Sequence, residues 1–153
     1  MDSALSPAAE RGFTLIEMLI VMLVVGILAS VMLPNYHQAT FKAQAADMVE
    51  RVHTITVAIK NYEADGGTVP SGAGPAGSPP AYLAPYVPAN LFQGAVGITL
   101  QLTGPSDGMP PTLLMTNGSD PGGRQILLAA AGMLGSAAYV MGDGQSVGVT
   151  LIP

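Results

Sequence analysis

Cysteine is absent from this chain of 153 residues. Its absence excludes a disulfide framework, thiolate metal sites and a lipid attached to an N-terminal cysteine. It does not fix the compartment, because many proteins that leave the cytoplasm fold without disulfides. The fold must therefore depend on its hydrophobic core, on a bound ion or on neighbouring molecules.

Charged residues are also scarce. They make up 10% of the chain, whereas apolar residues make up 49%, and an ordinary soluble domain has about 25% charged residues. Five Lys and Arg residues and a formal net charge of −5 leave no basic patch that could neutralise a phosphate backbone. The composition therefore argues against nucleic acid as a partner of the bulk of the chain.

Side chains suited to acid–base catalysis are few. His37 and His53 lie sixteen residues apart on a predicted helix, whereas metal ligands on one helix are usually three or four apart, so we expect both to be solvated. Glycine-rich matches to nucleotide-binding and hydrolase motifs lack the strand–turn–helix context that those motifs need. We therefore expect no catalytic residues and no enzymatic activity.

A long apolar run lies near the N-terminus, where residues 13–33 contain a single charged side chain, Glu17. A helix of this length spans about 31 Å, the thickness of a bilayer's hydrocarbon core. A cleaved secretory signal is the main alternative. However, the run is longer than the usual apolar part of a signal, and the segment before it carries Asp2, Glu10 and Arg11 instead of a basic cluster. The run therefore predicts a retained membrane helix.

Glu17 would place a carboxylate at membrane depth. Such a group costs about 2.5–3.5 kcal/mol on insertion, so a partner or a task is expected for it. The alternative is a residue near the helix start that reaches the interface and interacts favourably with the helix dipole. The physical argument alone leaves both interpretations open.

The residues around Glu17 carry a family resemblance. The segment Gly12-Phe13-Thr14-Leu15-Ile16-Glu17, an apolar run containing Gly26, and then Pro34-Asn35-Tyr36 resemble the N-terminus of type IV prepilins. The match extends over residues 11–36 with no departure from the family pattern. The chain thus resembles the type IV pilin-like proteins, which include the type II secretion pseudopilins.

This resemblance implies a role for five residues. A prepilin peptidase would cut after Gly12, the new N-terminal Phe13 would be N-methylated, and Glu17 would pair with the N-terminal amine of a neighbouring subunit. Such a buried pair is suited to setting register, because a misplaced subunit leaves a charge unpaired. The resemblance also implies that the portion from Gly26 to Pro34 can partly unwind during packing. Pro34 should bend the helix in any case, because it has no amide hydrogen to donate.

A second helical pattern follows the apolar run. Seven residues spaced alternately four and three apart form one helix face: Phe41, Ala45, Met48, Val52, Ile55, Ile59 and Tyr62. Charged residues lie off this face, and Asp47 and Arg51 form a favourable i,i+4 pair. We predict one helix from about Phe13 to about Glu63, ended by Asp65-Gly66-Gly67.

The remainder predicts a small β-rich domain. Residues 66–90 hold many prolines and glycines and predict an irregular connection rather than a folded core. Five strand candidates follow: Val96–Thr103, Thr112–Thr116, Gln125–Ala130, Ala137–Met141 and Ser146–Ile152. Residues 125–134 could instead form a short helix, and Asp143-Gly144 predicts a type I′ hairpin. An antiparallel sheet laid on the apolar helix face would bury both surfaces, which gives an α+β, pilin-like fold.

The predicted organisation has five parts: a cleaved leader (1–12), a transmembrane and filament-core helix (13–35), its amphipathic continuation (36–65), the connection (66–90) and the β-rich domain (91–153). The resemblance implies a structural subunit of a pilus-like filament in the bacterial inner membrane. The chain would cross that membrane once, with its N-terminus in the cytoplasm and its C-terminal domain in the periplasm or outside the cell. The implied partners are homologous subunits, the prepilin peptidase, an inner-membrane assembly platform and, before assembly, membrane lipid.

Two features favour a type II secretion pseudopilin within this family. Residues 62–70 resemble a Tyr…Asp-x-Gly-x-Tyr-Pro passage of those proteins, with Val69 in place of the second Tyr. The cysteine pair of many pilins is also missing. A type IV pilus or DNA-uptake minor pilin is the alternative, and a membrane-anchored binding domain with a single span is the alternative outside the family.

We expect no cofactor, although some pseudopilins bind calcium through a C-terminal loop. Asp107, Asp120 and Asp143 could contribute oxygens to such a site. Their spacing matches no compact calcium loop. Because aspartate is well suited to turns, solvated turn residues are the favoured interpretation.

Overall fold

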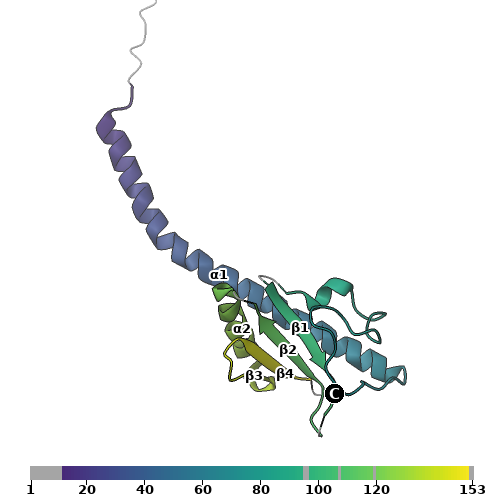
Figure 1. The fold of residues 1–153 in the computed structure, drawn as a ribbon. Coiled ribbons are helices and arrows are strands. Elements are labelled where there is room, and N and C mark those ends of the chain that lie inside the picture. The colour runs from purple at the N-terminus through teal and green to yellow at the C-terminus, as the bar shows by residue number, and fades with distance from the viewer. Residues whose placement is uncertain (1–11, 95–96, 107, 119, 152–153) are drawn as a thin grey trace, which may run out of the picture. The chain divides into compact units, whose positions relative to one another are not determined.

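The computed structural model describes residues 12–94, 97–106, 108–118 and 120–151. The chain divides into two compact units, Met1–His37 and Gln38–Pro153. The elements, shown in Figure 1, are α1 (Leu15–Ala64), the 3-10 helix η1 (Ala89–Phe92), β1 (Ile98–Thr103), β2 (Thr112–Asn117), α2 (Pro121–Leu134), the 3-10 helix η3 (Gly135–Ala137), β3 (Ala138–Val140) and β4 (Ser146–Thr150).

Both ends of α1 are set by local hydrogen bonds. The helix begins at Leu15, two residues later than predicted, because Thr14 caps it: the Thr14 hydroxyl accepts from the amide of Glu17 at 3.3 Å. At the other end the Gly67 amide donates to the carbonyl of Tyr62, and the Gly66 amide, at a φ of 85°, donates to that of Glu63. These two bonds form a Schellman motif, which confirms the predicted end of the helix.

The first unit carries the apolar start of α1. Every described residue of this unit, 12–37, is exposed. The most apolar part of α1 has a mean hydropathy of 2.7, and by length and composition the helix could cross a membrane. A buried core helix would have a similar composition, but none of this segment is buried within the chain. The described residues therefore leave this apolar surface uncovered.

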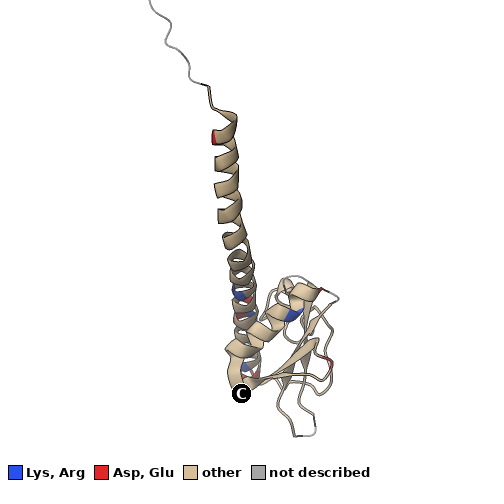
Figure 2. Cartoon of the chain, turned by 90° about the vertical axis from the view of Figure 1, so that its left-hand side faces the viewer, with Lys and Arg blue, Asp and Glu red and all other residues tan. Residues whose placement is uncertain are grey.

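The second unit uses the rest of α1 as one wall of its core. The predicted helix face is confirmed: five of its seven residues are buried, and the two at its ends, Phe41 and Tyr62, are partly buried. The sheet order is β1-β2-β4-β3, and all neighbouring strands are antiparallel. Alternate residues of β1 and β2 are buried, including Leu100, Leu113 and Met115. Both helices pack against this buried face (Figures 1 and 2).

Two local predictions for the C-terminal half are wrong. Residues 125–130 are not a strand but part of α2, which was the stated alternative. Asp120 caps α2 and Pro121 is its first residue, a start signal that outweighs the short apolar run. The β3–β4 hairpin is present, but Met141 pairs with Ser146 through a loop of four residues. Because the Gly144 amide donates to the Met141 carbonyl, the turn is not the predicted two-residue type I′ turn.

The irregular segment 66–90 differs from its prediction in one respect. It contributes Leu83 and Val87 to the core, so it is more than a connection. Its C-terminal part is held by Arg51 of α1 and by Asp65, which follows α1: the Tyr86 hydroxyl donates to the Asp65 carboxylate at 2.5 Å, and Arg51 donates to the carbonyl oxygens of residues 90 and 91 at 3.2 Å each. The hydrogen bond to Asp65 also raises the pKa of Tyr86. The predicted Asp47–Arg51 ion pair, at 2.8 Å, orients that arginine.

Replacing glycine by alanine should change the free energy of unfolding in opposite directions at the end of α1 and inside α2. Gly66→Ala forces a side chain into the left-handed region and should lower the free energy of unfolding by roughly 1 kcal/mol. Gly132→Ala lies in α2 with open space around it and should raise that free energy by about 0.5–1 kcal/mol. Urea unfolding of the detergent-solubilised chain, followed by circular dichroism, measures both. Changes of the same sign in the two variants would contradict this account.

Candidate functional site

The predicted processing and assembly residues lie at the start of α1. Gly12 and Phe13 precede the helix, and the Phe13 side chain is 73% exposed. A side chain at Gly12 would meet no atom within 4 Å. Gly12, Phe13, Thr14 and Glu17 together line one hollow. The peptide bond after Gly12 is therefore accessible to a second molecule.

Thr14 is a residue whose role the sequence reasoning missed. With Glu17 three positions later it forms a T-x-x-E sequence, the capping-box pattern, and this signal was present in the sequence. The Thr14 carbonyl also accepts from the amides of Glu17 and Met18, at 3.1 and 3.3 Å. The helix start is thereby fixed immediately before Glu17, which places its carboxylate in the first turn.

The Glu17 side chain has no partner among the residues that the structure describes. The described part of the chain holds one ion pair, Asp47–Arg51, and the hydrogen bond at Glu17 uses its backbone amide. The sequence has no further Asp, Glu, Lys or Arg until Lys42. Figure 2 shows this isolation as a single acidic residue near the start of α1. A partner for the carboxylate must then come from another molecule or from the chain's own N-terminal region.

The predicted flexibility residues, Gly26 and Pro34, lie further along α1 and do not join the hollow. A side chain at Gly26 would meet nothing within 4 Å. Pro34 has no amide hydrogen, so the Ser30 carbonyl loses its usual donor, while the Asn35 side chain donates to the Val31 carbonyl at 3.3 Å. The partial unwinding of this portion stays a prediction.

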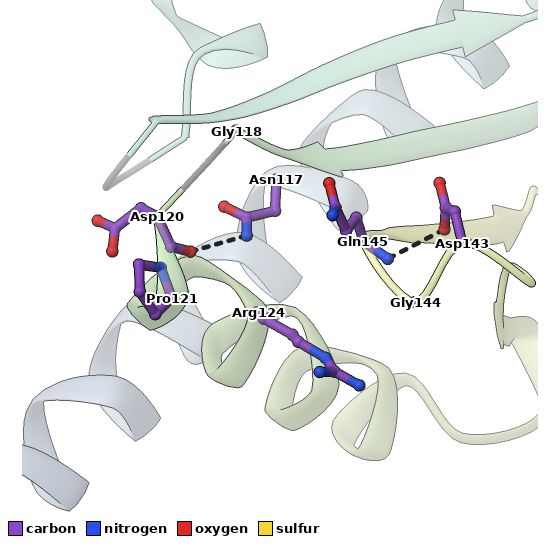
Figure 3. Close-up of a pocket in the computed structure, with 8 residues that line it drawn as sticks. All are labelled: Asn117, Gly118, Asp120, Pro121, Arg124, Asp143, Gly144 and Gln145. Atoms are coloured by element: carbon purple, nitrogen blue, oxygen red, sulfur yellow. Dashed lines mark hydrogen bonds between the residues drawn. The ribbon is translucent and has the colours of Figure 1, made fainter.

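The candidate calcium ligands that the structure describes, Asp120 and Asp143, accept local hydrogen bonds. Asp107 lies outside the described residues. Asp120 accepts from the Gly122 amide at 2.9 Å as the cap of α2, and Asp143 accepts from the Ser146 hydroxyl at 2.8 Å and from two amides at 3.0 Å. Both line a pocket of about 230 Å³ that also contains Arg124 (Figure 3). Among the described residues no three His, Asp or Glu side chains lie together as a metal site.

The two histidines are exposed, as predicted. Asn117, which lines the same pocket as Asp120 and Asp143, is a further residue that the sequence did not single out. Its side-chain nitrogen donates to the Asp120 carbonyl at 2.8 Å, while its buried Oδ1 has no partner among the described residues. It thus joins the end of β2 to the start of α2.

The chain is similar in sequence to a known N-terminal motif and to several fimbrial proteins and pilins. A family model described as the prokaryotic N-terminal methylation motif matches residues 7–33. The chain is 30% identical over 124 residues to a fimbrial protein of Pseudomonas aeruginosa, covering 79% of each chain. It is 28% identical over 115 residues to the fimbrial protein EcpC of Eikenella corrodens, covering 72% of this chain and 75% of the relative. No solved structure shows a significant match.

A third relative is the type IV major pilin protein PilE1 of Neisseria gonorrhoeae. It is 34% identical over 99 residues, which cover 62% of this chain and 55% of the relative.

The geometry at Asp143 predicts a pH dependence. The Ser146 hydroxyl, then the Gln145 amide, hold the pKa of Asp143 below its ordinary value. A lowered folded-state pKa stabilises the fold above the unfolded pKa, about 3.9, and this contribution is lost as pH falls through the folded value. The stability difference between the wild type and Asp143→Asn should therefore shrink below about pH 4. Thermal unfolding from pH 2 to 7 measures it.

The control for this prediction is Ser146→Ala. Removing the hydroxyl should move the pKa of the Asp143 carboxyl, measured by NMR titration, up toward its ordinary value. A difference between wild type and Asp143→Asn that is as large at pH 2 as at pH 7 would contradict the account.

Proposed function

The chain belongs to the type IV pilin family, and on that premise we propose that it is a membrane-anchored precursor cut, inserted and polymerised into a pilus. The family is one of structural subunits and not of enzymes. Membership itself accounts for the α+β fold, with one long helix and a four-stranded antiparallel sheet. The proposed function needs no cofactor.

One observation carries the proposal: the described part of the first unit, residues 12–37, is mainly an exposed apolar helix, and its one carboxylate, Glu17, has no partner among the described residues. The sixteen larger apolar side chains of residues 13–33 are all exposed. Left in water they would cost a large hydrophobic free energy, at about 25 cal/mol per Å². Lipid can cover them before assembly, and equivalent helices of other subunits can cover them afterwards.

The proposed roles follow the prepilin pattern. The peptidase cuts after Gly12, where the exposed backbone and the missing side chain allow close approach. The new amine of Phe13, methylated, pairs with Glu17 of a neighbouring subunit. Gly26 and Pro34 allow the helix to adapt as subunits pack. An inner-membrane assembly platform receives the processed chain, and the second unit lies on the outer side of that membrane.

A pilus is favoured by the relatives, which are named fimbrial proteins and major pilins. A type II secretion pseudopilin is the second candidate, supported by the passage at residues 62–70. In this passage Gly66 and Gly67 end α1, and the neighbouring Val69 is buried. These structural uses explain the residues without a secretion role, so the passage supports the second candidate only as a sequence pattern.

The Glu17→Leu variant tests the assembly role. The variant should enter the membrane and be cut after Gly12, because it keeps the apolar helix and the accessible peptide bond, but it should form few or no filaments. Mass spectrometry should show loss of residues 1–12 in the variant and, in the wild type, gain of one methyl group as well. Filaments in sheared fractions are counted by electron microscopy.

The matched control is Met18→Leu, an exposed neighbour on the same helix that carries no charge. It should process and assemble like the wild type. Normal filament numbers from Glu17→Leu would refute the pairing role, whereas an uncut chain or a cut near Ala29-Ser30 would refute the processing role.

A deletion strain separates the two candidate filaments. Loss of the gene should remove surface filaments and leave the secretome unchanged if the chain is a pilus subunit. Retention of normally secreted proteins in the periplasm, with surface filaments intact, would instead identify a pseudopilin. Complementation with the wild type should restore the lost property, and complementation with Glu17→Leu should not.

A further inference from the structure

The face of the sheet that points away from the two helices has an unusual composition. By alternation along the strands ten residues belong to this face: Thr99, Gln101 and Thr103 of β1; Thr112, Leu114 and Thr116 of β2; Tyr139 of β3; and Ser146, Gly148 and Thr150 of β4. Of these, Ser146 and Gly148 are buried. Six of the ten are Thr or Ser, and none carries a charge at neutral pH. We call this set the hydroxyl face.

The strand register arranges the hydroxyl face in three rows. Thr99, Thr116 and Ser146 form one outer row, and Thr103, Thr112 and Thr150 form the other. The central row runs from Tyr139 across Gly148 and Leu114 to Gln101. Strands lie about 4.8 Å apart, so this row is about 14 Å long. The central row thus has the Tyr139 ring at one end, Leu114 in its middle and the Gln101 amide at the other end, and a row of hydroxyl groups lies on each side of it.

Tyr139 is held on this face by the absence of a side chain at Gly148, its cross-strand partner. A Cβ built on Gly148 would lie 2.3 Å from Cζ of the Tyr139 ring, so the far end of the ring covers that backbone. The tyrosine nevertheless stays 45% exposed. It therefore offers an aromatic surface that is supported from below by the strand and is open above.

The hydroxyl groups are not all used within the fold. The Ser146 hydroxyl donates to Asp143, the Thr112 hydroxyl to the Pro110 carbonyl and the Gln101 amide to the Gly74 carbonyl. Among the described residues, the side chains of Thr116, Thr150 and Tyr139 make no hydrogen bond with the protein. Each of these hydroxyls can donate and accept.

These features fit one class of partner. A sugar ring has an apolar face of C–H groups that can stack on an aromatic ring, and a rim of hydroxyls that pair with threonine. Because the face carries no charge, it offers nothing to select an anionic chain. It also holds few apolar side chains, whereas stable interfaces between protein copies are more apolar. We propose that the hydroxyl face binds a neutral glycan chain, with Tyr139 as its stacking platform.

The test uses the full chain in a detergent without a sugar headgroup, so that detergent does not compete. The probes are cellohexaose, chitohexaose and maltohexaose, with hexagalacturonate as the charged counterpart. At least one neutral probe should bind saturably in calorimetry, with little dependence on salt, and hexagalacturonate should bind more weakly. Amide NMR shifts should concentrate on β2, β3 and β4.

Variants separate the stacking role from a purely structural one. Tyr139→Ala should weaken binding roughly tenfold or more, and Tyr139→Phe should bind nearly as well as the wild type. Thr116→Lys should block the face without removing the platform, while Gln125→Lys places the same charge on exposed α2 and should have no effect. If Tyr139→Ala disturbs the fold, the binding of the neutral probes to Thr116→Lys still tests the proposal.

Three results would overturn the proposal: no saturable binding of any neutral probe, unchanged binding in both Tyr139→Ala and Thr116→Lys, or a Thr116→Cys chain that crosslinks to a second copy without competition from the probes. The measurement uses unassembled chain, so its failure leaves the filament function intact. Glu17→Leu, which should not assemble, should bind the probes like the wild type.

Discussion

The structure depends on a constraint of solvation that α1 imposes. One helix of 50 residues contains a segment that is apolar on all sides and a segment that is apolar on one side. The second segment is satisfied within the chain, because the sheet and α2 cover its apolar face. The first is not, since no residue that the structure describes covers it. Folding therefore leaves the molecule incomplete, and both membrane insertion and polymerisation are ways to supply the missing surroundings.

The second unit is built to hold that helix firmly. Arg51 joins α1 to the segment before β1, and Tyr86 joins the end of α1 to the same segment. Gly74 and Gly77 donate to carbonyls of β1, so one edge of the sheet is covered by irregular chain. The opposite edge is β3, which is three residues long and therefore presents little backbone for unwanted pairing.

Most of the described surface outside α1 is uncharged, so its contacts with other molecules depend on shape, hydroxyl groups and apolar area.

A pattern that is sustained over many residues can be predicted from the sequence. A local structure that depends on a single contact cannot. The apolar face from Phe41 to Tyr62 repeats over six turns, so chance matches are averaged out and its burial was predicted correctly. Residues 125–130 are too short for that averaging, and the cap at Asp120 decided their structure. Leu83 is buried in the core although it lies in a segment rich in Pro and Gly. Its burial depends on tertiary contacts, which the local sequence pattern does not predict. The hairpin type likewise followed from the strand register.

For the candidate site, the sequence predicts the residues but not the side chain that fixes the helix start before Glu17. The helix start depends on a hydroxyl of Thr14, and the isolation of Glu17 is visible only once its neighbours are known. This isolation has a consequence for the energetics of polymerisation. A cut after Gly12 would create a cation four residues before Glu17 on the same chain. In the free subunit the two groups could neutralise each other, and joining a neighbour would then exchange one partner for another. Such an exchange changes the free energy little, so the apolar helix surface would drive growth while the charges select position.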